Sequence, residues 1–168
     1  MAGRLIRELA ERLGASLSAG GRLLAVAESC TGGSLCAAIT EIPGSSRYFL
    51  GGVVAYHDAV KTGAIDVPEE RILSEGAVSE PVAIAMAEGV RRRFGSDIGI
   101  GVTGIAGPGG GTKEKPVGTV CLGISAEGVR FSARRRFTGD REAVRTQAVA
   151  WALEELLRCV TAARGRKG

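Results

Sequence analysis

Short apolar segments alternate with amphipathic helical segments along most of the chain. Apolar runs and glycine punctuation predict strands at 23–27, 48–56 and 98–102, and helices at 34–39, 68–73 and 80–94. Two further strands, 117–125 and 129–137, are predicted to form a hairpin, and helices at 3–18 and 140–162 flank the set. Strands that alternate with helices and then pair as a hairpin predict an α/β domain, a three-layer α/β/α sandwich on a mixed sheet.

The length and composition of the chain set the number of domains. With 168 residues, 45% of them apolar, we expect one domain over 1–168, ending in a frayed tail at 164–168. Glycine is unusually common, at 26 residues, and gathers at a few places without a three-residue period. This pattern excludes a collagen-like chain and indicates backbone loops that serve a function. The pair Gly51-Gly52, inside a predicted strand, indicates either a bulge or a close approach of another part of the chain to the backbone.

Charge and cysteine patterns narrow the class of partner. The net charge is +4, and no aromatic residues interleave with the arginine triplets 91–93 and 134–136, so we expect no nucleic-acid partner. The N-terminal helix lacks the features of a signal peptide, and no apolar run approaches about 18 residues, so we expect no membrane partner and a cytoplasmic location. The four cysteines form no C-x-x-C pair and there is one histidine, so we expect neither a metal site nor disulfides.

Ser29 is the first candidate for chemistry. It follows a buried strand and precedes Gly32-Gly33 and a helix, which places it at the carboxyl edge of the sheet, where open α/β folds bind ligands. Backbone N–H groups at the start of that helix suit an oxyanion or a phosphate. Alternatively, Ser29 or Thr31 only caps the helix.

A serine nucleophile needs a base, and the segment after Tyr56 offers two. His57 is the only histidine, and Lys61 is the other candidate, as a neutral amine. If this segment is helical, Tyr56 and Lys61 lie within about 140° of each other and can face one site. The alternatives are an exposed loop histidine and a surface lysine.

A glycine-rich stretch follows the third predicted strand. Residues 99–104 match G-x-G-x-x-G, but they lie within a strand and no helix follows, so a dinucleotide site is not predicted. The exposed N–H groups of residues 101–112 instead suit an anion, with a plain flexible loop as the alternative. Arg141, at the start of the last helix, either holds an anionic ligand or is a surface arginine.

Four motifs in order resemble one known family. They are Ala27–Gly33; Gly51–Tyr56 with Lys61; Thr103–Pro108 followed by Lys115–Val120; and Phe137–Arg141. Together they resemble the CinA C-terminal domain family over roughly residues 5–162. The resemblance implies a sheet of about five strands between helical layers. Many relatives carry an additional N-terminal domain, for which we expect no room in this chain.

The resemblance also implies an activity. Members are similar to nicotinamide-nucleotide amidase, which hydrolyses the amide of nicotinamide mononucleotide (NMN) to nicotinate mononucleotide and ammonia in pyridine-nucleotide recycling. The catalytic serine, tyrosine and lysine align with Ser29, Tyr56 and Lys61, and the family uses no metal or other cofactor. A homodimer is expected from the family.

The expected substrate-binding residues come from the family motifs and from the backbone N–H groups that the glycine-rich segments expose. We expect N–H groups near Gly32-Gly33 or Thr103-Gly104 to stabilise the oxyanion. The phosphate is expected to bind in the Thr103–Gly107 region with help from Arg141. The expected substrate-binding set is Gly32, Gly33, Thr103, Gly104, Ala106, Gly107 and Arg141.

One segment departs from the family pattern. Relatives usually carry a Tyr-Ser-Asn-type run before the lysine, whereas this chain has Tyr56-His57-Asp58. A carboxylate at Asp58 near Lys61 would favour the protonated amine and weaken it as a base. Two other functions therefore stay open: an amidase or esterase for another small acyl substrate, and a nucleotide-binding or interaction domain without turnover. If Ser29 is not the nucleophile, Cys30 is the next candidate.

Overall fold

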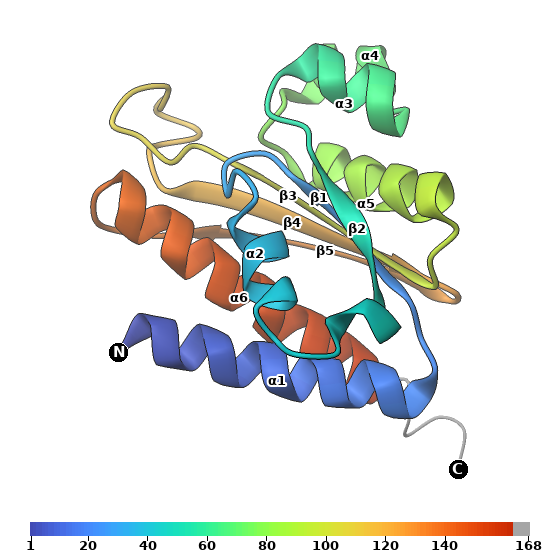
Figure 1. Ribbon diagram of the computed structural model, residues 1–168. Helices are drawn as coiled ribbons and strands as arrows, with labels where there is room; N and C mark the ends of the chain where they lie inside the picture. Colours follow the sequence, from blue (N-terminus) through green and yellow to red (C-terminus); the bar gives the residue numbers. More distant parts are fainter. Residues whose placement is uncertain (163–168) are drawn as a thin grey trace.

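A five-stranded mixed sheet forms the centre of the protein (Figure 1). The computed structural model describes residues 1–162. The strands are β1 (Leu24–Glu28), β2 (Phe49–Val54), β3 (Ile98–Gly104), β4 (Thr119–Ala126) and β5 (Val129–Arg136), in the spatial order β2-β1-β3-β4-β5. β1 is parallel to β2 and β3, while β4 and β5 are antiparallel to their neighbours. The carboxyl ends of β1, β2 and β3 therefore meet at one edge.

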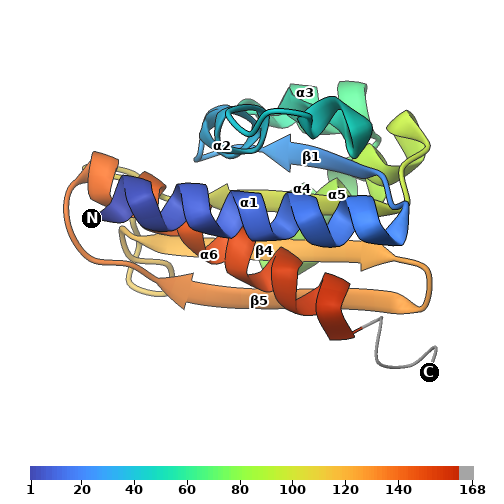
Figure 2. The same ribbon diagram turned by 60° about the horizontal axis from the view of Figure 1, so that its bottom comes forward.

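Helices cover both faces of this sheet (Figures 1 and 2). One layer contains α1 (Ala2–Gly20), α2 (Ser34–Thr40) and α6 (Arg141–Ala162). The other contains α3 (Asp58–Ile65), α4 (Glu69–Glu75) and α5 (Glu80–Phe94), and a short 3₁₀ turn, η1 (Ser45–Arg47), precedes β2. The three-layer sandwich predicted from the alternation of strands and helices is confirmed.

Alternation along β1 divides its side chains between the two layers. Leu24 and Val26 join the core on the α1–α6 side, whereas Ala25 and Ala27 join the smaller core beneath α3 and α5. Since successive side chains of a strand point to opposite faces, position 28 faces the α2 side and position 29 the α3 side. The strand thus directs Ser29 toward the layer that contains Lys61.

Glycines in β3 set the distance between the sheet and α5. A Cβ at Gly99 would collide with the Ala87 carbonyl oxygen, and one at Gly101 with the Ala83 carbonyl oxygen. The intervening Ile98, Ile100 and Val102 fill the opposite core. The glycine-spaced strand therefore lets α5 pack directly against the backbone.

The predicted elements agree with the structure except after Tyr56. Both alternatives for Gly51-Gly52 are present: Leu24 pairs with Phe49 and Ala25 with Gly51, which leaves Leu50 unpaired, and a Cβ at Gly52 would lie 2.9 Å from the Val26 carbonyl oxygen. Helix α3 is not among the predicted elements; the sequence analysis only considers the case in which the segment after Tyr56 is helical. The expected tail at 164–168 lies outside the described residues. Within those residues, no helix is long and apolar enough to cross a bilayer.

Candidate active site

A small cavity opens at the edge where β1 and β3 end. Its volume is about 220 Å³. The residues that line it come from the turn after β1, from β3 and the segment after it, from α3 and the residues before it, from the turn before α5 and from α6: Ser29, Cys30, Tyr56, Asp58, Lys61, Ala77, Val78, Thr103, Gly104, Ala106 and Arg141. The structure therefore brings Ser29, Tyr56 and Lys61 to one cavity, together with Thr103, Gly104, Ala106 and Arg141.

Ser29 lies on the turn between β1 and α2. Its N–H donates to the Val102 carbonyl at 2.8 Å, which extends the β1–β3 pairing by one residue. The chain then turns through Gly32 (φ 58°) and Gly33 (φ 95°), conformations that favour glycine. Only 7% of Ser29 is exposed, and the residue lines the cavity.

Glu28 explains why α2 starts where it does. Its carboxylate is fully buried and accepts hydrogen bonds from the N–H groups of Gly33 (3.1 Å), Leu35 (3.0 Å) and Cys36 (2.8 Å). Gly33 is the N-cap residue of α2, and the Glu28 side chain accepts the N–H groups at the start of the helix, a role that the sequence analysis considered for Ser29 or Thr31. An acidic residue at the end of a buried strand, just before a helix, was the available signal for this role.

The N–H groups of Gly32 and Gly33 are both engaged in hydrogen bonds within the protein. The Gly33 N–H is taken by Glu28, and the Gly32 N–H donates to the Ser29 carbonyl at 3.0 Å. Neither glycine lines the cavity. The structure thus leaves no free N–H at these two expected oxyanion donors.

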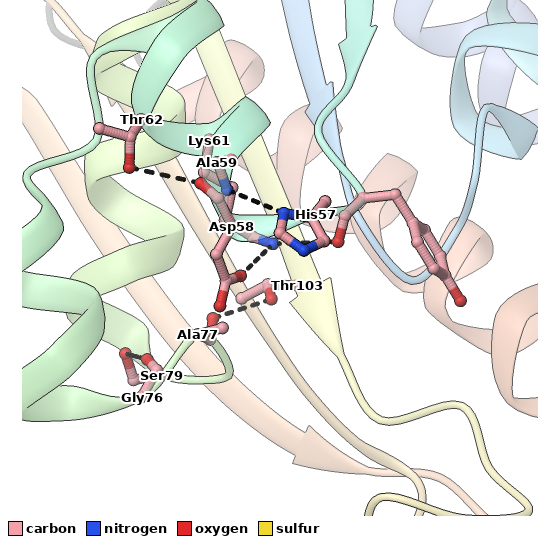
Figure 3. Close-up of polar contacts among 10 residues, drawn as sticks. His57, Asp58, Ala59, Lys61, Thr62, Gly76, Ala77, Ser79 and Thr103 are labelled. Carbon is pink, nitrogen blue, oxygen red and sulfur yellow. Dashed lines mark hydrogen bonds and ion pairs between the residues drawn. The ribbon is translucent and has the colours of Figure 1, made fainter.

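Lys61 lies at the inner wall of the cavity on α3. It is 1% exposed, and its Nζ donates to Asp58 Oδ1 at 3.0 Å and to the Tyr56 carbonyl at 3.3 Å (Figure 3). The negative charge expected near Lys61 is therefore present. His57, the other candidate base, is exposed and caps α3, since its Nδ1 accepts the Ala59 N–H at 3.2 Å. His57 is absent from the lining of the cavity.

Tyr56 and Arg141 meet at the mouth. The Arg141 guanidinium donates to the Tyr56 hydroxyl at 2.7 Å and to the Gly107 carbonyl at 2.8 Å. Tyr56 reaches Lys61 through its backbone carbonyl, while its hydroxyl is engaged by Arg141. Gly107 anchors Arg141 but does not line the cavity.

Thr103 closes the wall opposite α3. Its hydroxyl donates to the Ala77 carbonyl at 2.9 Å, and only 1% of the residue is exposed (Figure 3). Gly104 permits a close approach, because a Cβ there would lie 2.8 Å from Cys30 Sγ. Thr103 thus holds the turn before α5 against the cavity, with its hydroxyl proton already donated.

The pKa of Cys30 makes this neighbour of Ser29 a poor alternative nucleophile. Burial raises the pKa of the Cys30 thiol to about 12, so the thiol stays protonated at neutral pH and is a poor nucleophile. Two cations, Lys61 and Arg141, and one carboxylate, Asp58, line the cavity. Among residues 1–162, no cluster of histidine, cysteine and acidic side chains is arranged to hold a metal ion.

Comparison with known proteins gives a consistent result. The family model described as CinA C-terminal domain matches residues 6–160. A CinA-like protein of Gemmatimonas aurantiaca is 58% identical over 135 residues, which is 80% of this chain and 32% of that protein. One of Desulfotalea psychrophila is 49% identical over 150 residues, 89% of this chain and 36% of that protein. The chain thus spans about a third of the length of these curated relatives.

Solved structures agree with this assignment. A CinA superfamily protein of Klebsiella pneumoniae superposes with a TM-score of 0.90 at 38% identity, covering 94% of this chain and 98% of that one. The competence/damage inducible protein CihA of Agrobacterium tumefaciens gives 0.89 at 39% identity, covering 92% and 94%. The chain belongs to the CinA C-terminal domain family.

Proposed function

We propose that this domain hydrolyses the carboxamide of NMN to nicotinate mononucleotide and ammonia, with Ser29 as the nucleophile. The observation that carries the proposal is the shared cavity: the Ser29 turn and the buried Lys61 amine both line it at the carboxyl edge of the sheet. A hydroxyl and an amine enclosed together are the minimum for acyl transfer by a serine with a lysine base.

The steps follow from this pair. Ser29 Oγ attacks the amide carbon as Lys61, in its neutral form, accepts the hydroxyl proton. That proton then goes to the leaving nitrogen and ammonia departs, after which water hydrolyses the acyl-enzyme. The oxyanion is expected on the Thr103–Gly104 side, because the N–H groups of Gly32 and Gly33 are engaged.

Cavity size supports a substrate that is only partly enclosed. Pockets that bury a whole drug-sized ligand usually measure about 300–1,000 Å³, whereas this one measures about 220 Å³. We place the nicotinamide ring inside and the ribose phosphate at the mouth, next to Arg141. A guanidinium binds phosphate well, and Arg141 is already oriented by Tyr56 and Gly107.

A substrate panel tests the proposal. Purified protein is incubated with NMN, with nicotinamide riboside, with a simple aromatic amide and with an aryl ester, while ammonia or the released alcohol is measured. We expect the highest kcat/KM for NMN. A preference for the simple amide or the ester would replace NMN by another acyl substrate, and binding of NMN without turnover of any compound would indicate a non-catalytic domain.

A further inference from the structure

The Lys61 amine has two protein acceptors, and one of them is charged. Nζ donates to Asp58 Oδ1 and to the Tyr56 carbonyl. An ammonium group has three N–H donors, so one remains for the cavity that Ser29 also lines. The Lys61 side chain is 2% exposed and that of Asp58 is 52% exposed, so a buried cation is paired with a carboxylate that solvent reaches.

The position of Asp58 at the start of α3 suits a carboxylate. Asp58 is the first residue of α3, directly after the cap at His57. The N-terminus of a helix carries a partial positive charge, which stabilises a carboxylate in the first turn. Lys61 follows one turn later, so the helix itself sets the separation of the two groups.

Asp58 supplies the negative charge on the part of the cavity wall that the structure describes. On the turn after β1, Cys30 is neutral, because burial raises its pKa to about 12. From α6, Arg141 is a cation, and its guanidinium bonds to the Tyr56 phenol. Among the described residues that line the cavity, Asp58 is the sole carboxylate.

We infer that Asp58 is a positioning residue for the proposed reaction: its carboxylate fixes the Lys61 amine against the cavity and stabilises the ammonium form. The inference rests on the proposed function. The resting ammonium first releases one proton to solvent. The amine then takes the Ser29 proton as the C–O bond forms, and the ammonium so regenerated, again next to Asp58, passes this proton to the departing nitrogen.

This role gives the carboxylate two opposite effects on rate. Before the reaction it retains the proton on Lys61, so activity requires a higher pH. During the reaction it stabilises the positive charge that develops on Nζ, as the carboxylate of a Ser-His-Asp triad does for its imidazolium. Loss of the charge should therefore move the active range to lower pH and reduce the limiting rate.

Asp58→Asn tests the charge of this side chain while its size and shape stay nearly the same. The amide keeps an acceptor oxygen for Nζ but carries no charge. We expect the rising limb of kcat/KM against pH to move down by about one unit and the plateau to fall by about threefold. Asp58→Glu, which restores a carboxylate, should keep the limb close to that of the wild type.

Asp66→Asn is the matched control. It removes the same charge from the other end of α3, where Asp66 is the C-cap, is paired with Arg92 at 3.7 Å and is absent from the cavity. Asp66 has φ 54°, a conformation that asparagine also adopts. This variant should show the wild-type pH profile.

A second readout does not depend on turnover. The chain has four lysines, so ¹³C-lysine NMR can follow the Lys61 side chain through pH, with Lys61→Met to assign its signal. We expect its midpoint to fall in Asp58→Asn and not in Asp66→Asn. An unchanged midpoint in Asp58→Asn overturns the inference. A lowered midpoint in a protein that releases no ammonia from NMN overturns the proposed function alone.

Discussion

The Arg141 guanidinium lies 2.7 Å from the Tyr56 hydroxyl, which joins the start of α6 to the segment before α3 across 85 positions of sequence. The contact forms the mouth of the cavity. It also gives Tyr56 a role that its place in the family motif does not reveal, because its hydroxyl orients a cation while its carbonyl receives the Lys61 amine.

Arg141→Ala and Tyr56→Phe should therefore act on substrate binding. We expect Arg141→Ala to raise KM for NMN by about tenfold, since charged hydrogen bonds contribute about 1.5–3 kcal/mol, and Tyr56→Phe to raise it by a smaller factor. The double variant should resemble Arg141→Ala, because both changes remove one contact. The KM for nicotinamide riboside, which has no phosphate, should change little in these variants.

Arg136→Ala, which changes an exposed arginine of β5, is the control. A loss confined to kcat in Tyr56→Phe would instead support a proton relay through its hydroxyl.

Glu28→Gln should destabilise the fold strongly. Three N–H groups of the α2 start point at this buried carboxylate, and an amide NH₂ in its place would face donors with a donor. We expect the free energy of unfolding in urea to fall by about 2–4 kcal/mol. Glu41→Gln breaks only an exposed contact with Arg7 at 3.3 Å and should cost less than about 1 kcal/mol. Equal effects of the two variants would contradict the capping role.

His57 should prove to be a cap and not a base. His57→Asn keeps a side-chain acceptor for the Ala59 N–H but removes the imidazole, so we expect wild-type kcat and little loss of stability. His57→Ala should lose about 0.5–1 kcal/mol through the missing cap. A large drop of kcat in His57→Asn, with the fold intact by circular dichroism, would return His57 to the role of general base.

The Cys30 thiol should be unreactive in the folded protein. Since burial raises its pKa to about 12 in the native state, above its ordinary value of 9.0, the folded chain retains this proton more tightly than the unfolded chain. The resulting contribution to stability is complete at neutral pH and is lost as pH rises from about 9 toward 12. Mass spectrometry after iodoacetamide at pH 8 should find Cys30 unmodified in native protein and modified in urea. Fast native labelling would make Cys30 a competing nucleophile.

The sequence predicted the elements of this fold because their signals are local. Helix α5 is an example: Ser79 accepts the Val82 N–H at its start and Gly95 ends it, so each signal lies directly next to the helix end that it marks. Helix α3 was harder, since it is eight residues long, contains Gly63 and buries only Lys61 and Ile65. Its apolar pattern is therefore too short to show a helical period.

The site was predicted as a set of residues but not as a set of contacts. Ser29, Tyr56, Lys61 and Arg141 reach one cavity, as the motifs suggested. The engagement of the Gly33 N–H by Glu28 depends on the direction in which β1 sends its last side chain. The Tyr56–Arg141 contact depends on how α6 docks. Neither is encoded by the spacing of residues near it.

The role of Ser29 as the nucleophile can be tested by measuring ammonia release from NMN by purified wild-type and Ser29→Ala protein. The substitution removes one hydroxyl, while the backbone N–H that bonds to Val102 stays, so the thermal midpoint should change little. We expect stoichiometric ammonia and nicotinate mononucleotide from the wild type and none above background from Ser29→Ala. Release by Ser29→Ala at close to the wild-type rate would contradict this role.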